Sequence, residues 1–157
     1  MTADLIVIGK TDLEAVASLL EMYMKRINRY VKFSVVTIPD LRNTRNIAES
    51  AQKKQEGDLL LKQFAAGDYV VLLDDKGTGH TSMGFAAWLQ KRMASGIRRL
   101  VFVIGGPYGF SQEVYARADE QLSLSRMTFS HQIVRALFAE QLYRAFAILN
   151  NEPYHHE

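Results

Sequence analysis

Two glycine-bearing segments are the first places where the chain could hold a small ligand. They are Ile104–Gly109 (IGGPYG) and Asp75–His80 (DKGTGH). Glycine adopts positive φ and lets a ligand approach the backbone closely. Neither segment has the G-x-G-x-x-G spacing of a dinucleotide site or the spacing of a phosphate-binding P-loop. Taken alone, each segment is more often a tight turn than a binding site.

Few side chains could perform acid–base or nucleophilic chemistry. His131, His155 and His156 are candidates, but a histidine at a helix start is usually structural and neighbouring histidines in a polar tail are usually solvated. The chain has no cysteine, which excludes disulfides, thiolate zinc sites and cysteine nucleophiles. It also lacks H-E-x-x-H and G-x-S-x-G, which weakens hydrolase interpretations. So small a set suits a reaction that depends mainly on positioning two bound partners.

Composition predicts one domain spanning residues 1–157. Of the 157 residues, 48% are hydrophobic, which is enough for a sizeable core. A net charge of +2 permits a nucleic-acid partner without requiring one. No apolar run approaches the roughly 20 residues that span a bilayer, and the first residues lack the features of a signal peptide. We therefore expect a soluble cytoplasmic protein without a membrane partner.

Strand and helix signals alternate along the whole chain. Short β-branched runs predict four strands, and a weaker run predicts a fifth, at 4–9, 32–38, 69–74, 100–104 and 121–125. Helical periodicity is found at 12–27, 46–64, 82–95, 111–118 and 130–150. Asp12 and Ser130 are the predicted caps of the first and last helices. This alternation predicts an α/β fold with a mainly parallel sheet and helices on both faces.

The last predicted helix carries more apolar side chains than one buried stripe needs. A surface helix of a monomer requires only one such stripe. The surplus predicts a second buried face, most simply across the two-fold axis of a homodimer. The alternative is a helix packed deep within its own domain. The apolar positions are Ile133, Val134, Leu137, Phe138, Leu142, Ala145, Phe146, Ile148 and Leu149.

Several motifs together resemble a known family. They are VIGK (7–10), VVLLDDKG (70–77), FVIGGPYGF (102–110) and the carboxy-terminal stretch 122–157, with LSLSRMT, HQIVR, EQLYRA and PYH. In these segments the chain resembles the RlmH family (long known as YbeA) of the SPOUT superfamily. Members of that family are pseudouridine-N3 methyltransferases of large-subunit ribosomal RNA. The resemblance covers nearly the whole length, and only the helix at 46–64 matches weakly.

The resemblance implies a fold and a cofactor that periodicity alone does not supply. It implies a single SPOUT domain whose carboxy-terminal region forms a deep trefoil knot, a rare exception to unknotted topology. It also implies that S-adenosylmethionine binds at a dimer interface without a metal and leaves as S-adenosylhomocysteine. The cofactor-binding residues implied by the motifs are Leu73, Gly105, Leu124, Ser125, Arg126, Met127, Thr128 and Phe129.

The implied reaction is methylation of N3 of a pseudouridine in helix 69 of 23S ribosomal RNA, on the assembled 70S ribosome. The catalytic candidates are His155, Tyr154 and Arg135, and the expected substrate contacts are Arg135, Arg144, Tyr154 and His155. The arginines would bind phosphates, and the tail residues would lie near the base. As an alternative, both arginines form salt bridges within the helix. The resemblance transfers no agreed general base.

Two other functions stay open from sequence. One is a non-catalytic, ribosome-associated RNA-binding protein of the same fold. The other is a flavodoxin-like protein that binds a small ligand. Tight binding of S-adenosylmethionine would exclude the flavodoxin-like protein, and methyl transfer to ribosomes would exclude the non-catalytic one.

Overall fold

A five-stranded, entirely parallel sheet organises the chain. The computed structural model describes residues 1–156. The strands are β1 (Thr2–Ile8), β2 (Lys32–Ile38), β3 (Tyr69–Gly79), β4 (Arg99–Ile104) and β5 (Glu120–Ser123). They lie in the order β2-β1-β4-β3-β5, which places β1, β4 and β3 inside the sheet. The predicted parallel α/β sheet is confirmed.

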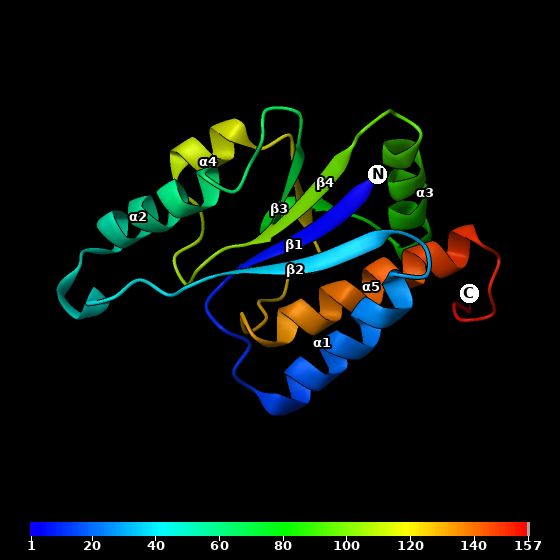
Figure 1. Cartoon of the computed structure of the whole chain (residues 1–157), viewed down its shortest axis with the longest axis horizontal. Helices are drawn as coiled ribbons and strands as arrows, with labels where there is room; N and C mark the ends of the chain where they lie inside the picture. Colours follow the sequence, from blue (N-terminus) through cyan, green and yellow to red (C-terminus); the bar gives the residue numbers. More distant parts are fainter. Residues whose placement is uncertain (157) are drawn as a thin grey trace.

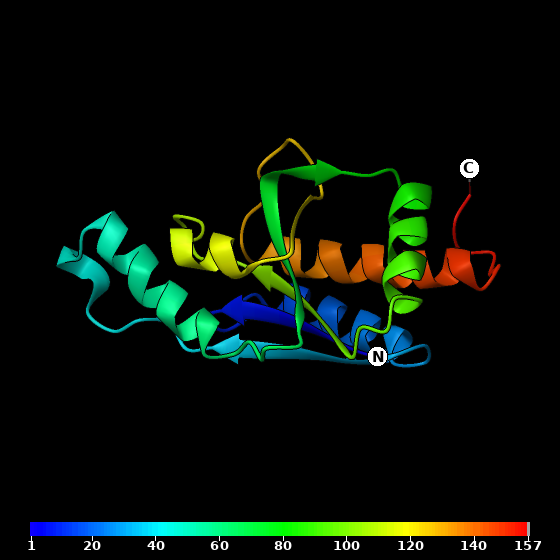
Figure 2. The same ribbon diagram turned by 90° about the horizontal axis from the view of Figure 1, so that it is seen from above.

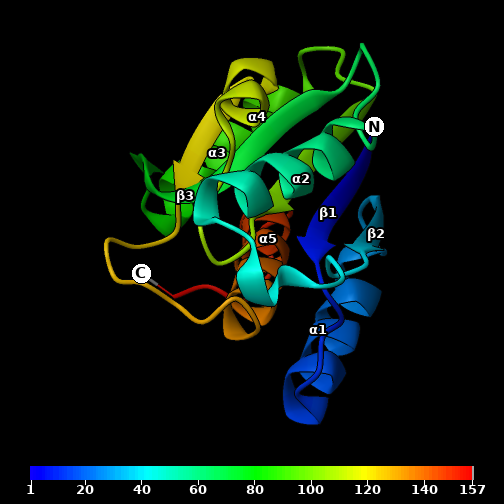
Figure 3. The ribbon, with the colours of Figure 1, turned by 90° about the vertical axis from the view of Figure 1, so that its left-hand side faces the viewer.

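Helices cover both faces of this sheet, as predicted (Figures 1 and 3). One core lies beneath α1 (Glu14–Ile27), α3 (Ser82–Met93) and α5 (Ile133–Leu149). The opposite core lies beneath α2 (Glu49–Leu61) and α4 (Gln112–Arg117). No helix within residues 1–156 combines the length and the apolar character needed to cross a membrane.

Neither predicted cap residue occupies a helix cap position. Gln132 is at the cap position of α5, without a side-chain cap bond, although the Ser130 hydroxyl accepts a hydrogen bond from the Ile133 N–H at 3.1 Å just before it. The prediction for Asp12 is wrong, since Leu13 occupies the cap position of α1 and no side chain caps that helix. Asp12 instead donates its backbone N–H to Oε1 of Gln132 at 2.8 Å. This bond ties the chain after β1 to the start of α5.

Two predicted boundaries are also corrected. β3 continues to Gly79, so the polar glycine segment is strand where a turn was expected. Leu122 pairs with both Leu73 and Thr78, and residues 74–77 therefore bulge out of the ladder. The helix predicted at 46–64 is divided into a short 3-10 helix, η1 (Thr44–Asn46), and α2. Ile47 between them has extended backbone, which interrupts the helix.

Most of the apolar surplus of α5 is buried within its own chain. α5 packs against α1 and α3, and the ring of Phe138 lies 4.6 Å from that of Phe102 on β4. The alternative of a deeply packed helix thus accounts for much of the sequence pattern. Ile133 and Leu137, 46% and 38% exposed, are the large apolar side chains that α5 still presents to solvent.

Candidate cofactor site

Three chain segments meet in a cavity at the carboxyl ends of β3, β4 and β5. Carboxyl ends of parallel strands share one edge of a sheet, which is where α/β proteins commonly bind ligands. Figure 2 shows the segment after β5 beside the outer end of β3. The cavity measures about 520 Å³. Its walls come from residues 73–76, 104–110, 124–125 and 127–131, together with Tyr115 and Val134.

The cavity gathers nearly all of the residues predicted to bind the cofactor. Seven of the eight line it, although they come from three separate parts of the sequence. Arg126 is the exception and is absent from the walls. The seven are Leu73, Gly105, Leu124, Ser125, Met127, Thr128 and Phe129.

The loop after β4 needs glycine for steric reasons. A Cβ on Gly105 would lie 3.0 Å from the ring of Phe110, and a Cβ on Gly106 would lie 2.5 Å from a carboxylate oxygen of Glu56. Gly109 has a φ of +80° and donates its N–H to the Gly106 carbonyl at 3.1 Å. The backbone of the loop therefore forms part of the cavity wall directly, without side chains in between.

Glu56 is a buried carboxylate that the sequence did not single out. It extends from α2 to the back of the glycine loop, and only 4% of its surface is exposed. Its Oε1 has no hydrogen-bond partner within residues 1–156. Burial raises the pKa of Glu56 above its ordinary value. No sequence signal marked it, because a glutamate in a mostly polar helix is normally exposed.

The segment after β5 supplies an irregular wall with exposed apolar side chains. The Ser125 hydroxyl accepts the Met127 N–H at 3.0 Å, and the Ser123 hydroxyl donates to the Ser125 carbonyl at 2.9 Å. These bonds fix the turn while Met127 and Phe129 stay 75% and 37% exposed. Backbone groups and apolar surface side by side suit a ligand with a flat, polar-edged ring.

Arg135 does not occupy the position expected of a residue that contacts RNA. Its side chain is only 1% exposed, and burial lowers its pKa. The guanidinium donates to the carbonyls of Ile8, Gly9 and His131 at 2.9 Å, and to the Thr11 hydroxyl at 2.8 Å. We correct the expectation accordingly: Arg135 ties the end of β1 to α5 and has no surface left for a phosphate.

The carboxy-terminal tail is folded back on α5 instead of fraying. Asn151, with a φ of 55°, ends the helix, and Tyr154 then donates its hydroxyl to Glu140 at 2.9 Å. The ring of Tyr154 packs edge-on against Tyr143, with centroids 4.7 Å apart. Burial, followed by the hydrogen bonds to Tyr23 and Glu140, raises the pKa of Tyr154. Glu157, the last residue of the predicted tail, lies outside the described residues.

Arg144 connects this tail to the helix. It pairs with Glu140 one turn earlier, and its guanidinium lies 4.7 Å from the centre of the Tyr154 ring. Its Nη1 also donates to Nδ1 of His155 at 3.1 Å. Arginine only donates, so a neutral His155 imidazole in this arrangement carries its proton on Nε2. The salt-bridge alternative for Arg144 is therefore present, and its expected contact with the RNA substrate stays a prediction.

Within one chain the tail does not reach the cavity. The cavity touches the start of α5 at Val134, whereas Tyr154 and His155 contact Glu140 and Arg144 farther along the helix, and neither tail residue lines the cavity. The six to ten residues between Val134 and these contacts rise about 9 to 15 Å along the helix. One chain therefore does not unite Tyr154 and His155 with the seven cavity residues.

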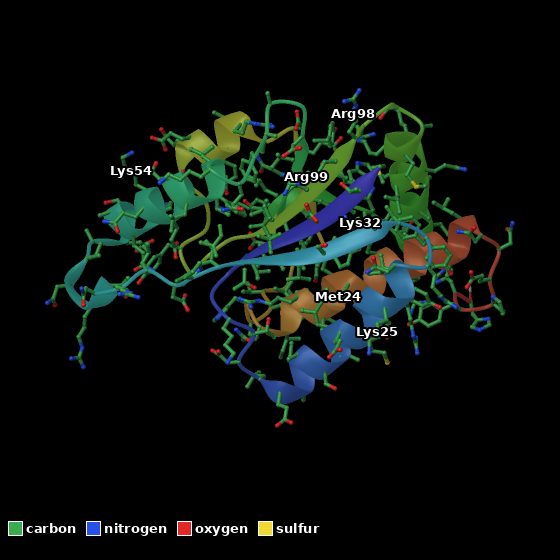
Figure 4. All side chains as sticks on the ribbon, in the orientation of Figure 1. Met24, Lys25, Lys32, Lys54, Arg98 and Arg99 are labelled. Atoms are coloured by element: carbon green, nitrogen blue, oxygen red, sulfur yellow. The ribbon has the colours of Figure 1, made fainter. Side chains whose placement is uncertain are left out.

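Other charged groups have structural roles at the opposite edge of the sheet. Arg99, labelled in Figure 4, bonds Asp4 at 2.6 Å and Asp68 at 2.5 Å near the amino ends of the strands. Residues 1–156 contain no group of three histidine, aspartate or glutamate side chains placed to hold a metal ion. The cavity at the carboxyl edge is thus the best-formed candidate site.

The fold and the cavity define a class of protein. Residues 1–155 match the family model described as a predicted SPOUT methyltransferase, and the chain belongs to that family. A protein of Christiangramia forsetii is 55% identical over 99% of both chains, and one of Parabacteroides distasonis is 54% identical over the full length of both. A third, from Flavobacterium johnsoniae, is 53% identical over both full lengths. All three are named ribosomal RNA large subunit methyltransferase H.

Proposed function

We propose that this chain is an S-adenosylmethionine-dependent methyltransferase that modifies N3 of a pseudouridine in helix 69 of 23S-type ribosomal RNA. The relatives' names support ribosomal RNA of the large subunit as the substrate. The base and the position rest on the resemblance of the sequence motifs. The proposed substrate, the assembled 70S ribosome, places the reaction in the cytoplasm.

One observation carries the proposal: a single cavity unites the three segments in which cofactor-binding residues were expected. Gly105 and Gly106 leave the loop backbone bare, and the irregular wall at 124–130 offers further backbone groups. When bound, S-adenosylmethionine supplies an electrophilic methyl group on its sulfonium. The residues of the cavity then need only hold and orient it, which agrees with the sparse set of acid–base groups.

The tail is the proposed acceptor part of the site. Tyr154 offers an aromatic face for a flipped-out base, and Arg144 and His155 lie beside it. Tyr154 and His155 are the proposed groups beside N3 of the base, from which a proton must leave when the methyl group is transferred.

We further propose that the working enzyme is a homodimer in which one chain supplies the cavity and its partner supplies the tail. The tail contacts of α5 lie about 9 to 15 Å along the helix from the cavity, and neither Tyr154 nor His155 lines the cavity of its own chain. Antiparallel helices across a two-fold axis would bring the tail of one chain to the cavity of the other. Ile133 and Leu137 remain exposed near the cavity end of α5 and would be covered in such a dimer. Sedimentation of the micromolar protein should give about twice the chain mass of 17.8 kDa.

The trefoil knot implied by the resemblance belongs to the same proposal. Its support is the path of the chain around the cavity. β5 pairs outside β3, and the following segment passes along the cavity wall before α5 returns to pack on α1.

The charge distribution supports an RNA substrate despite the modest net charge. η1 and α2 project from the body of the molecule (Figures 1 and 2). Arg42, Arg45 and Lys54 on this projection are exposed, and Figure 4 shows Lys54 directed away from the sheet. Exposed cations on this projection can hold phosphates while base contacts provide specificity.

Methyl transfer to ribosomes tests the function. Ribosomes from a strain lacking this methylation should accept one labelled methyl group per particle from S-adenosylmethionine. Mass spectrometry of the digested RNA should place it on a pseudouridine in helix 69. Ribosomes that also lack the pseudouridine should accept none. Cofactor binding without transfer to any ribosomal particle would favour the non-catalytic RNA-binding alternative, and no cofactor binding would overturn the proposal.

A further inference from the structure

The wall of the cavity contains a carboxylate held in place by two other parts of the chain. Asp74 lies where β3 leaves its pairing with β5 and begins the bulge at residues 74–77. Its Oδ1 accepts the Lys76 N–H at 3.0 Å, and its Oδ2 accepts the hydroxyl of Tyr115 from α4. Tyr115 also lines the cavity, and its ring packs edge-on against Phe110 of the glycine loop. Asp74 is therefore fixed between β3 and α4, on the inner surface of the cavity.

The hydrogen bonds keep this group charged. Burial raises the pKa of Asp74, but the bonds from Tyr115 and from the Lys76 N–H outweigh it, and the pKa lies below its ordinary value. Burial and the same contact raise the pKa of Tyr115 to about 12. At neutral pH the pair is consequently a carboxylate and a neutral phenol.

The cavity as a whole complements a cationic ligand. Its lining contains the carboxylates of Asp74 and Asp75 and the ammonium of Lys76, which leaves a net negative charge when His131 is neutral. S-adenosylmethionine carries a sulfonium, an ammonium and a carboxylate, and is a net cation at neutral pH. S-adenosylhomocysteine has lost the sulfonium charge and is neutral overall, while 5′-methylthioadenosine has no charged group.

We propose that Asp74, oriented by Tyr115, is the counter-charge for a cationic group of the cofactor and makes the cavity prefer S-adenosylmethionine to 5′-methylthioadenosine, which has no charged group. This inference rests on the proposed function. A fixed carboxylate in a partly enclosed cavity attracts a cation more strongly than one in open water, because less solvent screens it. The orienting hydroxyl lets Asp74 face the ligand without moving when the ligand binds.

The test is isothermal titration of the full-length protein with S-adenosylmethionine, S-adenosylhomocysteine and 5′-methylthioadenosine. Asp74→Asn keeps the shape of the side chain and removes its charge. It should weaken binding of S-adenosylmethionine about tenfold and change binding of methylthioadenosine by less than about twofold. Tyr115→Phe keeps the ring packing and should show the same selectivity with a smaller loss. If Asp74→Asn also weakens binding of S-adenosylhomocysteine, the group paired with Asp74 is the ammonium. If binding of S-adenosylhomocysteine is unchanged, the paired group is the sulfonium.

Glu113→Gln is the matched control. Glu113 lies on α4 two residues before Tyr115, is exposed and is absent from the cavity walls. Removing its charge should leave all three affinities unchanged. If Asp74→Asn lowers the affinity for all three ligands equally, Asp74 has a structural role and the inference is overturned. Unchanged affinity of this variant for S-adenosylmethionine would also overturn the inference. Wild-type protein that binds no S-adenosylmethionine would instead overturn the proposed function itself.

Discussion

At the scale of single residues, the cavity depends on positions where a side chain is missing. Gly105 and Gly106 bring the loop backbone close to Phe110 on one side and to Glu56 on the other. The sequence pointed to Gly105 only through the resemblance of its motif to a known family, because glycines after a strand are by themselves more often a tight turn. Glu56 gave no such signal, since its burial depends on α2 packing behind the loop.

Gly105→Val should abolish cofactor binding, because its side chain would meet the ring of Phe110 and displace the loop that forms the cavity wall. The variant should keep a nearly native far-UV circular dichroism spectrum, with some loss of stability where the new Cβ meets Phe110. S-adenosylhomocysteine should raise the melting temperature of the wild type by binding its folded state, and should not do so for the variant. If S-adenosylhomocysteine raises the melting temperature of the variant as much as that of the wild type, the cofactor binds elsewhere.

Glu56→Gln should stabilise the protein increasingly as pH rises. Burial raises the pKa of Glu56 in the folded state, so the unfolded chain releases this proton first. The contribution of protonated Glu56 to the free energy of unfolding is fully present below the unfolded pKa near 4.5 and is lost as pH rises through the folded pKa. Glutamine has no proton to lose, so the variant keeps this contribution at high pH. Thermal unfolding should show little difference at pH 4 and a gain of at least about 2 °C at pH 8.

Glu49→Gln, an exposed change in the first turn of α2, is the control for this titration. It should show no growing difference between pH 4 and pH 8. A Glu56→Gln variant that is less stable than the wild type at pH 8 would mean that the carboxylate makes a favourable contact in its ionised form.

At the scale of elements, hydrophobic pattern predicted where strands and helices lie better than where they end. The central strands are continuous apolar runs, because a strand buried on both faces needs apolar side chains at successive positions. The extension of β3 to Gly79 was missed because its polar residues pair through backbone groups that any side chain permits. The start of α1 was misplaced because Gln132, 120 residues away, holds Asp12.

The tail is the element whose order the sequence pattern alone did not predict. Six polar residues after a helix are usually frayed. Here the contacts of Tyr154 with Glu140 and Tyr143, and of His155 with Arg144, hold it on α5. These partners lie 11 to 14 residues earlier in the chain, so only the folded helix reveals them.

Deleting residues 153–157 should separate acceptor chemistry from cofactor binding. The cavity is lined entirely by residues up to Val134, so affinity for S-adenosylmethionine should stay nearly unchanged. The methylation rate should fall by at least about a hundredfold, the usual effect of losing a positioned acid–base group. Arg45→Ala on η1, far from the tail, is the control variant. Its single-turnover methylation rate at saturating ribosome concentration should equal that of the wild type. Full methylation activity of the truncated protein would show that the tail is not part of the acceptor site.

At the scale of the whole molecule, the two predicted halves of the site are not joined within a single chain. Seven residues that were expected to bind the cofactor line one cavity, while Tyr154 and His155 contact α5 farther along at Glu140 and Arg144 and do not line it. Spacing along the sequence does not carry this information, because the position of the tail relative to the cavity depends on how the chain folds back on a rigid helix. A second chain is what our account requires to complete the site.

Mixing two inactive variants tests this central claim most directly. Gly105→Val removes the cavity but keeps the tail, and deletion of 153–157 removes the tail but keeps the cavity. After co-refolding in equal amounts, half of the dimers should be mixed and each should contain one complete site. We predict recovery of about one quarter of the wild-type methylation rate on ribosomes, while each variant alone stays inactive. No recovery from mixtures shown by mass spectrometry to contain mixed dimers would contradict a site shared between chains.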